Sequence, residues 1–249
     1  MTPAAFKRSI RDLQVWCSSC MVAFSGSDPV GVLIGAKRPS GTLIHRIAVH
    51  PDHLRQGHGR HLLTSLGSKL AILGPPRIVA EVPEAFAAAS GLFSASGFVQ
   101  ETLLTDYVWQ WEVNDVPRVD ATFVIPVTVG DLAANGLLEG DHPQTCWERS
   151  VETLTARKDD IAGLAVASDE RIEGYLLYSR EGEILSLRSL IEDDGVRLRL
   201  LLSQLRAAGL GAFRIPKVHP AEISQELLET LGVRPAGGYR LYVGKARAA

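Results

Sequence analysis

The chain has 249 residues, of which 46% are apolar, so it can bury one large core or two small ones and is not a disordered tail. Its formal net charge of −2 and sequence pI of about 6.4 exclude an overall positive field that would hold nucleic acid, so any anion site must be local. The N-terminus carries spaced charges, and no eighteen uncharged apolar residues run together. We therefore expect a cytoplasmic protein with no membrane span.

Strand and helix patterns alternate through the first half of the chain after an antiparallel meander. The helix predicted at 59–73 has a stripe of leucines and stops at Pro75-Pro76. The expected elements, in order, are a helix at 4–19, strands at 21–24, 30–36 and 42–49, the helix at 59–73, a strand at 77–82, a helix at 85–96 and strands over 98–113. This order indicates an α/β or α+β fold with a mixed sheet.

The second half repeats this order after a linker-like stretch at 114–118. Its expected elements are a strand at 121–128, helices at 129–138 and 145–157, strands at 161–167, 174–179 and 184–191, a helix at 196–209, a strand at 212–218, a helix at 222–232 and a strand pair around 237–246. Local likenesses, such as HLLTSL beside LLLSQL, fall at the same place in the order. The repeat predicts two domains of one fold, residues 1–114 and 115–249.

The three cysteines, Cys17, Cys20 and Cys146, are too few and odd in number for a disulfide framework. The first two have the C-x-x-C spacing of thioredoxin-like redox motifs, which follow a strand and begin a helix. Here a helical pattern precedes the pair and a strand follows it. We therefore favour packing at a helix end over redox chemistry.

The stretch HPDHLRQGHGRHLL, residues 50–63, follows a strand and opens a helix. Unsatisfied amides and the positive end of the macrodipole favour an anion at such a position. Gly57 and Gly59 let the backbone approach a ligand closely, and Arg55 and Arg60 add positive charge. The stretch thus predicts a phosphate cradle, with an ordinary tight turn as the alternative. Its spacing is neither that of a P-loop nor that of a Rossmann turn.

Five of the seven histidines, at positions 45, 50, 53, 58 and 61, lie in or beside this stretch. A metal site would need cysteine or carboxylate partners at ligand spacing, and these are missing. Successive strand residues also point to opposite faces. We expect no metal here and assign the histidines to the polar rim or to packing.

The stretch resembles the pyrophosphate loop of the GNAT superfamily of acetyl-CoA-dependent N-acetyltransferases, Q/R-x-x-G-x-G/A after a strand that ends apolar-apolar-Val-x-Pro. The strand end is Ile47-Ala48-Val49-His50-Pro51 and the loop is Gln56-Gly57-His58-Gly59-Arg60. The family's downstream order continues with Leu92-Phe93 and Gly97-Phe98, so the resemblance covers most of residues 21–112.

The resemblance implies two tandem domains, each a mixed, mostly antiparallel twisted sheet flanked by helices, with acetyl-CoA as co-substrate. By it, the strand residues that hydrogen-bond the pantetheine arm are Ile47, Ala48 and Val49. The residues whose backbone amides hold the pyrophosphate are Arg55, Gln56, Gly57, His58, Gly59 and Arg60.

Acetyl transfer to an amine benefits from a base, because an amine like that of lysine titrates near about 10.4 and is mostly protonated at neutral pH. Glu81 is the candidate, at the strand position where some family members carry their catalytic glutamate. Its apolar neighbours could raise its pKa by desolvation. The alternative is an ordinary strand carboxylate, and Glu84 and His45 are the reserve bases.

Three positions depart from the family pattern, and each loses a polar group. Phe93 stands where many members have the tyrosine that protonates the departing thiol, Phe86 replaces an asparagine that contacts the cofactor, and Leu54 replaces the first polar residue of the loop motif. A thiol with a pKa of about 8.5 is a tolerable leaving group unaided, so slow or water-assisted transfer is expected.

The second domain departs further. Residues 191–197, at the place of the phosphate loop, have one glycine and three acids that would repel a diphosphate, and Leu228 matches Phe93. We expect a degenerate copy that does not bind the cofactor and that covers the acceptor cleft or forms a homodimer. The aromatic residues of the terminal strands are expected to pack rather than contact substrate; they are Trp109, Trp111, Tyr239 and Tyr242.

The leading hypothesis is an N-acetyltransferase that acts on a small-molecule or peptide amine, with no nucleic-acid or membrane partner. The alternatives are a module that binds coenzyme A or an acyl-CoA with little catalysis, and a scaffold that binds neither. The acceptor and the acyl chain length have no readable sequence code.

Overall fold

The computed structural model describes residues 2–110, 123–138, 145–210 and 212–247. It contains two compact units, Met1–Leu103 with Gly238–Ala249, and Leu104–Gly237. The predicted boundary between residues 114 and 115 lies outside the described residues and stays a prediction. Among the described residues, no helix is both long and apolar enough to cross a membrane.

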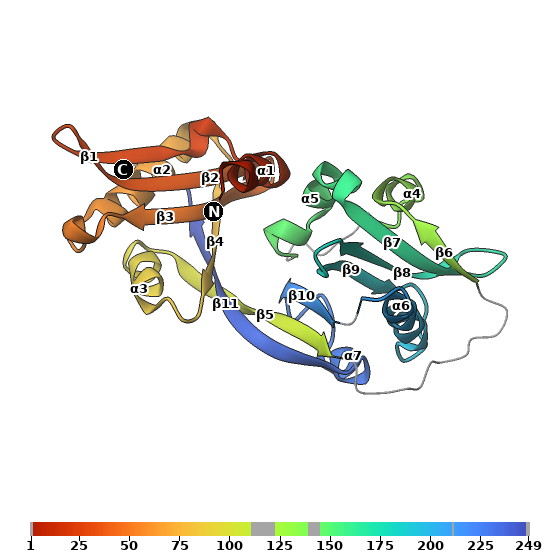
Figure 1. The fold of residues 1–249 in the computed structure, drawn as a ribbon. Helices are drawn as coiled ribbons and strands as arrows, with labels where there is room; N and C mark the ends of the chain where they lie inside the picture. The colour runs from red at the N-terminus through yellow and green to blue at the C-terminus, as the bar shows by residue number, and fades with distance from the viewer. Residues whose placement is uncertain (1, 111–122, 139–144, 211, 248–249) are drawn as a thin grey trace. The chain divides into compact units, whose positions relative to one another are not determined.

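The first unit contains a mixed sheet with helices between its strands (Figure 1). Its elements are α1 (Pro3–Leu13), the 3₁₀ helix η1 (Cys17–Ser19), β1 (Met21–Ser25), β2 (Asp28–Arg38), β3 (Gly41–Val49), the 3₁₀ helix η2 (Pro51–His53), α2 (His58–Leu73), β4 (Arg77–Pro83), α3 (Ala87–Ala95), the start of β5 (Val99–Gln110) and the end of β11 (Val233–Lys245). The strand order is β1-β2-β3-β4-β11. Only the β3–β4 pair in this row is parallel, which confirms the predicted mixed, mostly antiparallel sheet.

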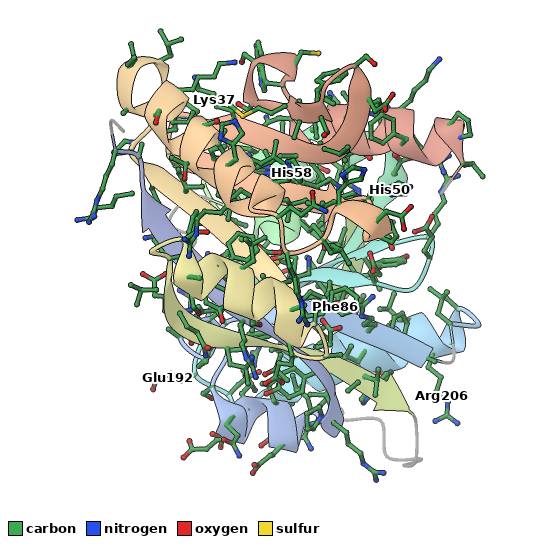
Figure 2. The ribbon with its side chains drawn as sticks, turned by 90° about the vertical axis from the view of Figure 1, so that its left-hand side faces the viewer. Lys37, His50, His58, Phe86, Glu192 and Arg206 are labelled. Carbon is green, nitrogen blue, oxygen red and sulfur yellow. The ribbon has the colours of Figure 1, made fainter. Side chains whose placement is uncertain are left out.

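Helices α2 and α3 cover one face of this sheet (Figure 2). The predicted leucine stripe of α2 is buried in that interface: Leu62, Leu63, Leu66 and Leu70. β4 alternates buried and half-buried residues, so that Ile78, Ala80 and Val82 face the helices. Glu81 therefore points to the opposite face.

The first helix is shorter than the sequence predicted. It ends at Leu13, because Gln14 has a φ of 59° and Val15 forms an antiparallel bridge with Ala36. The amide of Trp16 also donates to the carbonyl of Gly35 at 3.2 Å. Backbone pairing with β2 thus outweighs the helical spacing of the apolar residues, and the C-x-x-C pair lies at η1, after the helix has ended.

The second unit contains a four-stranded antiparallel sheet, β6-β7-β8-β9, and strands β5 and β10, which pair antiparallel and continue the strand order after β11. Its elements are the end of β5, β6 (Phe123–Val127), α4 (Val129–Ala134), the 3₁₀ helix η3 (Trp147–Arg149), α5 (Val151–Ala156), the 3₁₀ helix η4 (Lys158–Asp160), β7 (Ile161–Ala167), β8 (Ile172–Ser179), β9 (Ile184–Ser189), α6 (Val196–Ala207), β10 (Ala212–Val218), α7 (Gln225–Thr230) and the start of β11.

The end of the chain differs from the prediction of a strand pair around 237–246 in the second domain. Residues 233–245 form one continuous strand, β11, and residues 239–245 pair antiparallel with β4. This pairing places residues 238–245 of the last strand in the first unit.

Candidate functional site

Strands β3 and β4 are paired only at their beginnings. The parallel register joins Thr42 to Ile78 and Leu43 to Val79, yet β3 continues to Val49 and β4 to Pro83. From these pairs onward the two edges separate, and we call the facing edges of residues 44–49 and 80–83 the β3–β4 split. In the described register, the recorded β3–β4 pairs thus stop at the closed end of the split.

A β-bulge lies at the closed end of the split. Ile34 and Gly35 are consecutive in β2, whereas their partners in β3, Arg46 and Ile44, are two residues apart. His45 is the extra residue. A bulge bends its strand and increases the local twist, which turns the rest of β3 away from β4.

The register of β3 determines which backbone groups face the split. The amide of His50 donates to the carbonyl of Val30 at 2.8 Å, and bonded positions alternate along an antiparallel pair. Ala48, predicted as a pantetheine contact, therefore bonds toward β2. Ile47 and Val49 direct their N–H and C=O groups toward the split, where an extended ligand with amide groups could pair with them as an added strand.

The loop before α2 adopts the backbone conformation that its glycines predict. Arg55 has a φ of 60° and Gly57, the N-cap of α2, a φ of 90°. A Cβ at Gly57 would meet no atom within 4 Å, whereas a Cβ at Gly59 would lie 3.1 Å from Leu92 Cδ2 in α3. Gly57 thus keeps the helix end open, and Gly59 lets α2 approach α3.

The backbone amides of this loop are available to an anion. Within the part of the chain that the structure describes, no loop or turn hydrogen bond is donated by the amides of residues 55–57, and no side chain caps α2. Arg55 is exposed, and Arg60 donates to the carbonyl of Ala95 at 3.0 Å. Helix-end amides with two nearby guanidinium groups favour a phosphate or diphosphate.

The histidines form a chain of ring contacts beside the loop. The ring of His53 lies edge-on to those of His50 and His58, with centroids 6.0 Å apart in both pairs. His50 and His58 are labelled in Figure 2. Among the described residues, no group of three or more histidine, cysteine or acidic side chains is placed to hold a metal ion. These rings contact one another in the turn between β3 and α2.

The three candidate bases lie in different places. Glu81 is half-buried on β4, just past the last β3–β4 pair, and His45 is half-buried at the bulge, so both border the closed end of the split. Glu84 is exposed beyond the end of β4 and lies 3.9 Å from the Arg240 guanidinium. Position therefore favours Glu81 and His45 over Glu84.

The three residues that depart from the family pattern differ in how exposed they are. Phe93 is 2% exposed and lies in the α2–α3 core, whereas Phe86 and Leu54 are 60% and 56% exposed. The ring of Phe93 lies edge-on to Phe98 at 5.3 Å and is stacked with Tyr242 at 5.7 Å.

Tyr242 is a residue whose polar surroundings the sequence did not reveal. It lies on β11 opposite Ala80, is 4% exposed, and stacks on the residue that replaces the expected tyrosine. A hydrogen bond with Ser94, joined by a second with Ser90 and by the nearby Arg240, lowers the pKa of Tyr242 against the opposing effect of burial. No local pattern predicts these contacts, because they depend on the pairing of the last strand with β4.

Comparison with known proteins finds a domain family that matches the part of the chain containing the loop and the split. Residues 16–100 match the acetyltransferase (GNAT) domain family. They include the loop, both strands of the split and α3.

Residues 16–100 form a GNAT domain. No curated protein matches the sequence significantly.

Solved structures extend the likeness to almost the whole chain. One is a tandem GNAT protein from the clavulanic acid biosynthesis pathway, with 17% identity over 97% of this chain and 88% of that chain and a TM-score of 0.66. A GCN5-related N-acetyltransferase from Sphaerobacter thermophilus shares 14% identity over 92% and 81%, with a TM-score of 0.65. Eis1 from Mycobacterium abscessus shares 16% identity over 99% and 72%, with a TM-score of 0.53. At these identities the likeness shows the fold alone, which is that of tandem GNAT proteins.

In the second unit a carboxylate occupies the N-terminal end of the central helix. Asp193 accepts hydrogen bonds from the amide of Gly195 at 3.1 Å and from that of Arg197 at 2.8 Å, at the start of α6. A Cβ at Gly195 would lie 2.7 Å from Leu227 Cδ1, so the side chain of Leu227 fills the space beside this glycine. The amides of Gly195 and Arg197, at the start of α6, therefore already have an acceptor within the protein.

An arginine side chain bridges the strands that correspond to the split. β9 and β10 flank α6 as β3 and β4 flank α2, and among the described residues their recorded bridge is the isolated parallel one between Glu183 and Arg214. The guanidinium of Arg149, with a side chain 0% exposed, donates to the carbonyl of Leu185 on β9 at 3.1 Å and to that of Pro216 on β10 at 3.4 Å.

Proposed function

We propose that the protein is an N-acetyltransferase that moves the acetyl group of acetyl-CoA to an amine of a small molecule or peptide, with the co-substrate bound by the first unit. The observation that carries this proposal is the β3–β4 split beside the open N-terminus of α2. A diphosphate and an extended amide chain need these two features next to each other, and the GNAT match covers both.

Each part of the co-substrate has a candidate partner in this unit. The diphosphate would accept hydrogen bonds from the amides of residues 55–60, with charge from Arg55. The two amides of the pantetheine arm would pair with Ile47 and Val49, the β3 residues whose backbone groups face the split. This path leaves the thioester near the closed end, beside Glu81 and His45.

The chemistry needs a neutral amine next to the thioester carbonyl. Glu81 would accept a proton from the incoming ammonium group, directly or through water, after which the amine nitrogen attacks the carbonyl carbon. The tetrahedral intermediate then collapses: the nitrogen loses a second proton, the carbon–sulfur bond breaks, and the sulfur takes up that proton through water and leaves as the coenzyme A thiol. General base catalysis contributes roughly 10²–10⁴ in rate.

A second candidate function is a module that binds coenzyme A or an acyl-CoA without turnover. The observation that favours it is Phe93, which is buried in the apolar α2–α3 core and has no acidic proton to donate to the leaving thiolate. Such a module would use the same split and loop, so binding alone does not distinguish it from the enzyme.

Calorimetry with coenzyme A and an acetyl-transfer assay on amines, peptides and aminoglycosides test the two functions together. We expect binding of coenzyme A, transfer to at least one class of amine, and a loss of about 10²-fold or more in kcat for Glu81→Gln with unchanged affinity. Glu101→Gln, an exposed carboxylate in the same unit, is the matched control. Binding without transfer favours the module, and no binding at all contradicts both functions.

A further inference from the structure

The two cysteines of the C-x-x-C pair differ in exposure. Cys17 is exposed, Cys20 is half-buried, and both are free thiols. The sequence favoured packing at a helix end for this pair, yet α1 ends at Leu13 and the Cys17 side chain stays open to solvent. Disulfide exchange with a dissolved molecule requires such an accessible thiol.

The backbone of η1 brings the two cysteines within reach of each other. The amide of Cys20 donates to the carbonyl of Cys17 at 3.0 Å, which closes a 3₁₀ turn between them. In such a turn the side chains at positions i and i+3 eclipse, and the end Cα atoms of a four-residue turn lie within about 7 Å. A disulfide spans Cα atoms about 4.4–6.8 Å apart. The turn therefore has the span and the side-chain direction that a Cys17–Cys20 disulfide needs.

The sulfur of Cys20 is directed toward the peptide group that carries Cys17. Cys20 Sγ donates to the carbonyl of Trp16 at 3.3 Å, and the carbon of that carbonyl is bonded to the Cys17 nitrogen. The same sulfur lies 4.0 Å from the carbonyl oxygen of Gly35. Cys20 is thus held beside Cys17, where it can attack a disulfide that forms first at the more exposed thiol.

Strand β2 holds this turn in place. The amide of Trp16 donates to the carbonyl of Gly35 at 3.2 Å, and a Cβ at Gly35 would clash with the carbonyl oxygen of Ser19. Glycine at this position lets η1 lie directly on the strand, and β1 begins at Met21, directly after the pair. A fixed turn gives the two thiols a high effective concentration for each other, so an internal disulfide forms in preference to a lasting mixed one.

We propose that Cys17 and Cys20 form a redox-active dithiol that exchanges with the disulfide of a small thiol, such as oxidised glutathione, and closes to an internal disulfide. Cys17 reacts first and Cys20 resolves the mixed disulfide. The site uses none of the residues assigned to the co-substrate, so it stands whether or not the proposed function does.

Two exchange steps complete the reaction. The thiolate of Cys17 attacks one sulfur of the small disulfide, the sulfur–sulfur bond breaks, and the first small thiol leaves with the proton that Cys17 gave up. The thiolate of Cys20 then attacks the Cys17 sulfur of the mixed disulfide and releases the second small thiol, which takes the proton of Cys20. The protein loses two electrons and two protons, and the small disulfide gains both.

Trapping of the mixed disulfide gives the first test. The full-length protein is equilibrated with reduced and oxidised glutathione and quenched with iodoacetamide, and mass spectrometry follows the tryptic peptide of residues 12–37, which contains both cysteines. We expect an internal disulfide in the wild type. In Cys20→Ser we expect glutathione bound at Cys17, at a level at least tenfold above the mixed disulfide of the wild type.

Two further variants complete this experiment. Cys17→Ser should take up glutathione severalfold more slowly than Cys20→Ser, because its remaining thiol is half-buried. Cys146→Ser removes the buried third thiol and, as the matched control, should behave as the wild type does. Equal amounts of mixed disulfide in the wild type and in Cys20→Ser overturn the proposal. Equal rates of uptake in Cys17→Ser and Cys20→Ser overturn it as well, because the order of attack is then wrong.

An arsenical tests the pairing in the wild-type chain, without oxidation and without reliance on the folding of a variant. Phenylarsine oxide binds two neighbouring thiols at once, whereas an excess of a monothiol displaces it from a single thiol. In the presence of excess 2-mercaptoethanol, we expect one phenylarsine oxide per native chain and slower alkylation of both Cys17 and Cys20. Alkylation of the two cysteines at the same rate with and without phenylarsine oxide overturns the proposal.

Discussion

The central helices of the two units begin with the same backbone and differ in what their amides meet. α2 starts at Gly57 with a φ of 90° and α6 at Gly195 with a φ of 75°, and in each loop a non-glycine residue with positive φ, Arg55 or Asp194, comes shortly before. At Gly57 a Cβ would meet nothing within 4 Å, whereas at Gly195 it would meet Leu227. The amides after Gly195 are held by Asp193.

Side chains of the second unit meet the backbone groups whose counterparts in the first unit are open. From the sequence, three acids at residues 191–197 suggested repulsion of a diphosphate. In the structure one of them, Asp193, accepts hydrogen bonds from the helix-end amides, and Arg149 donates to strand carbonyls on β9 and β10. Buried polar groups need partners, so a copy that gave up its ligand would have to supply them from its own side chains.

Removal of the Arg149 guanidinium is expected to have the largest effect. Arg149→Met leaves Glu222, its partner at 2.6 Å, and two strand carbonyls without their donor, which should lower the free energy of unfolding by about 3–5 kcal/mol. Urea denaturation followed by tryptophan fluorescence measures this, since Trp147 is buried in the same 3₁₀ helix.

Two variants sharpen this measurement. Arg199→Met, an exposed arginine on α6, should change stability by less than about 0.5 kcal/mol. Arg149→Met with Glu222→Leu should recover part of the loss, because no charge then stays buried without its partner. Equal stability of Arg149→Met and Arg199→Met would show that the guanidinium does not hold the strands.

Local patterns in the sequence were enough for most of the fold and for the open turn before α2. The leucine stripe of α2 and the break at Pro75-Pro76 predict that helix well, and the two glycines predict the open turn, because each of these signals lies within a few residues of the structure it determines. The GNAT resemblance likewise rested on motifs inside residues 21–112.

The remaining features depend on contacts between segments far apart in the chain. β11 pairs with β4 across most of the sequence, so neither its place in the first unit nor the neighbours of Tyr242 follow from local spacing. Arg149 lies in a stretch that was predicted only as helix, and burial of an arginine has no periodic signature. The end of the first helix was missed because the Val15 bridge to β2 is also non-local.

A carboxylate placed in the first loop should make it resemble the second. Aspartate tolerates a left-handed backbone better than most residues. In Gly57→Asp its carboxylate places a negative charge where the diphosphate is proposed to bind. We expect a loss of about 10²-fold in affinity for coenzyme A, measured by calorimetry. Gly97→Asp is the matched control, with a φ of 83° and likewise no atom within 4 Å of a Cβ. If both variants bind coenzyme A equally well, the loop does not hold the diphosphate.

The converse change in the second unit should have the smallest effect. Asp193→Ala removes the acceptor of the Gly195 and Arg197 amides, which should cost about 1 kcal/mol in the free energy of unfolding, the usual value of such a helix-end contact. Glu192→Ala removes an exposed charge one residue away and serves as the control. Calorimetry on Asp193→Ala should still give one coenzyme A per chain, because Arg149 continues to join β9 and β10 where the pantetheine would lie. A second binding event in Asp193→Ala would mean that the carboxylate alone keeps the ligand out, and that Arg149 moves aside to admit it.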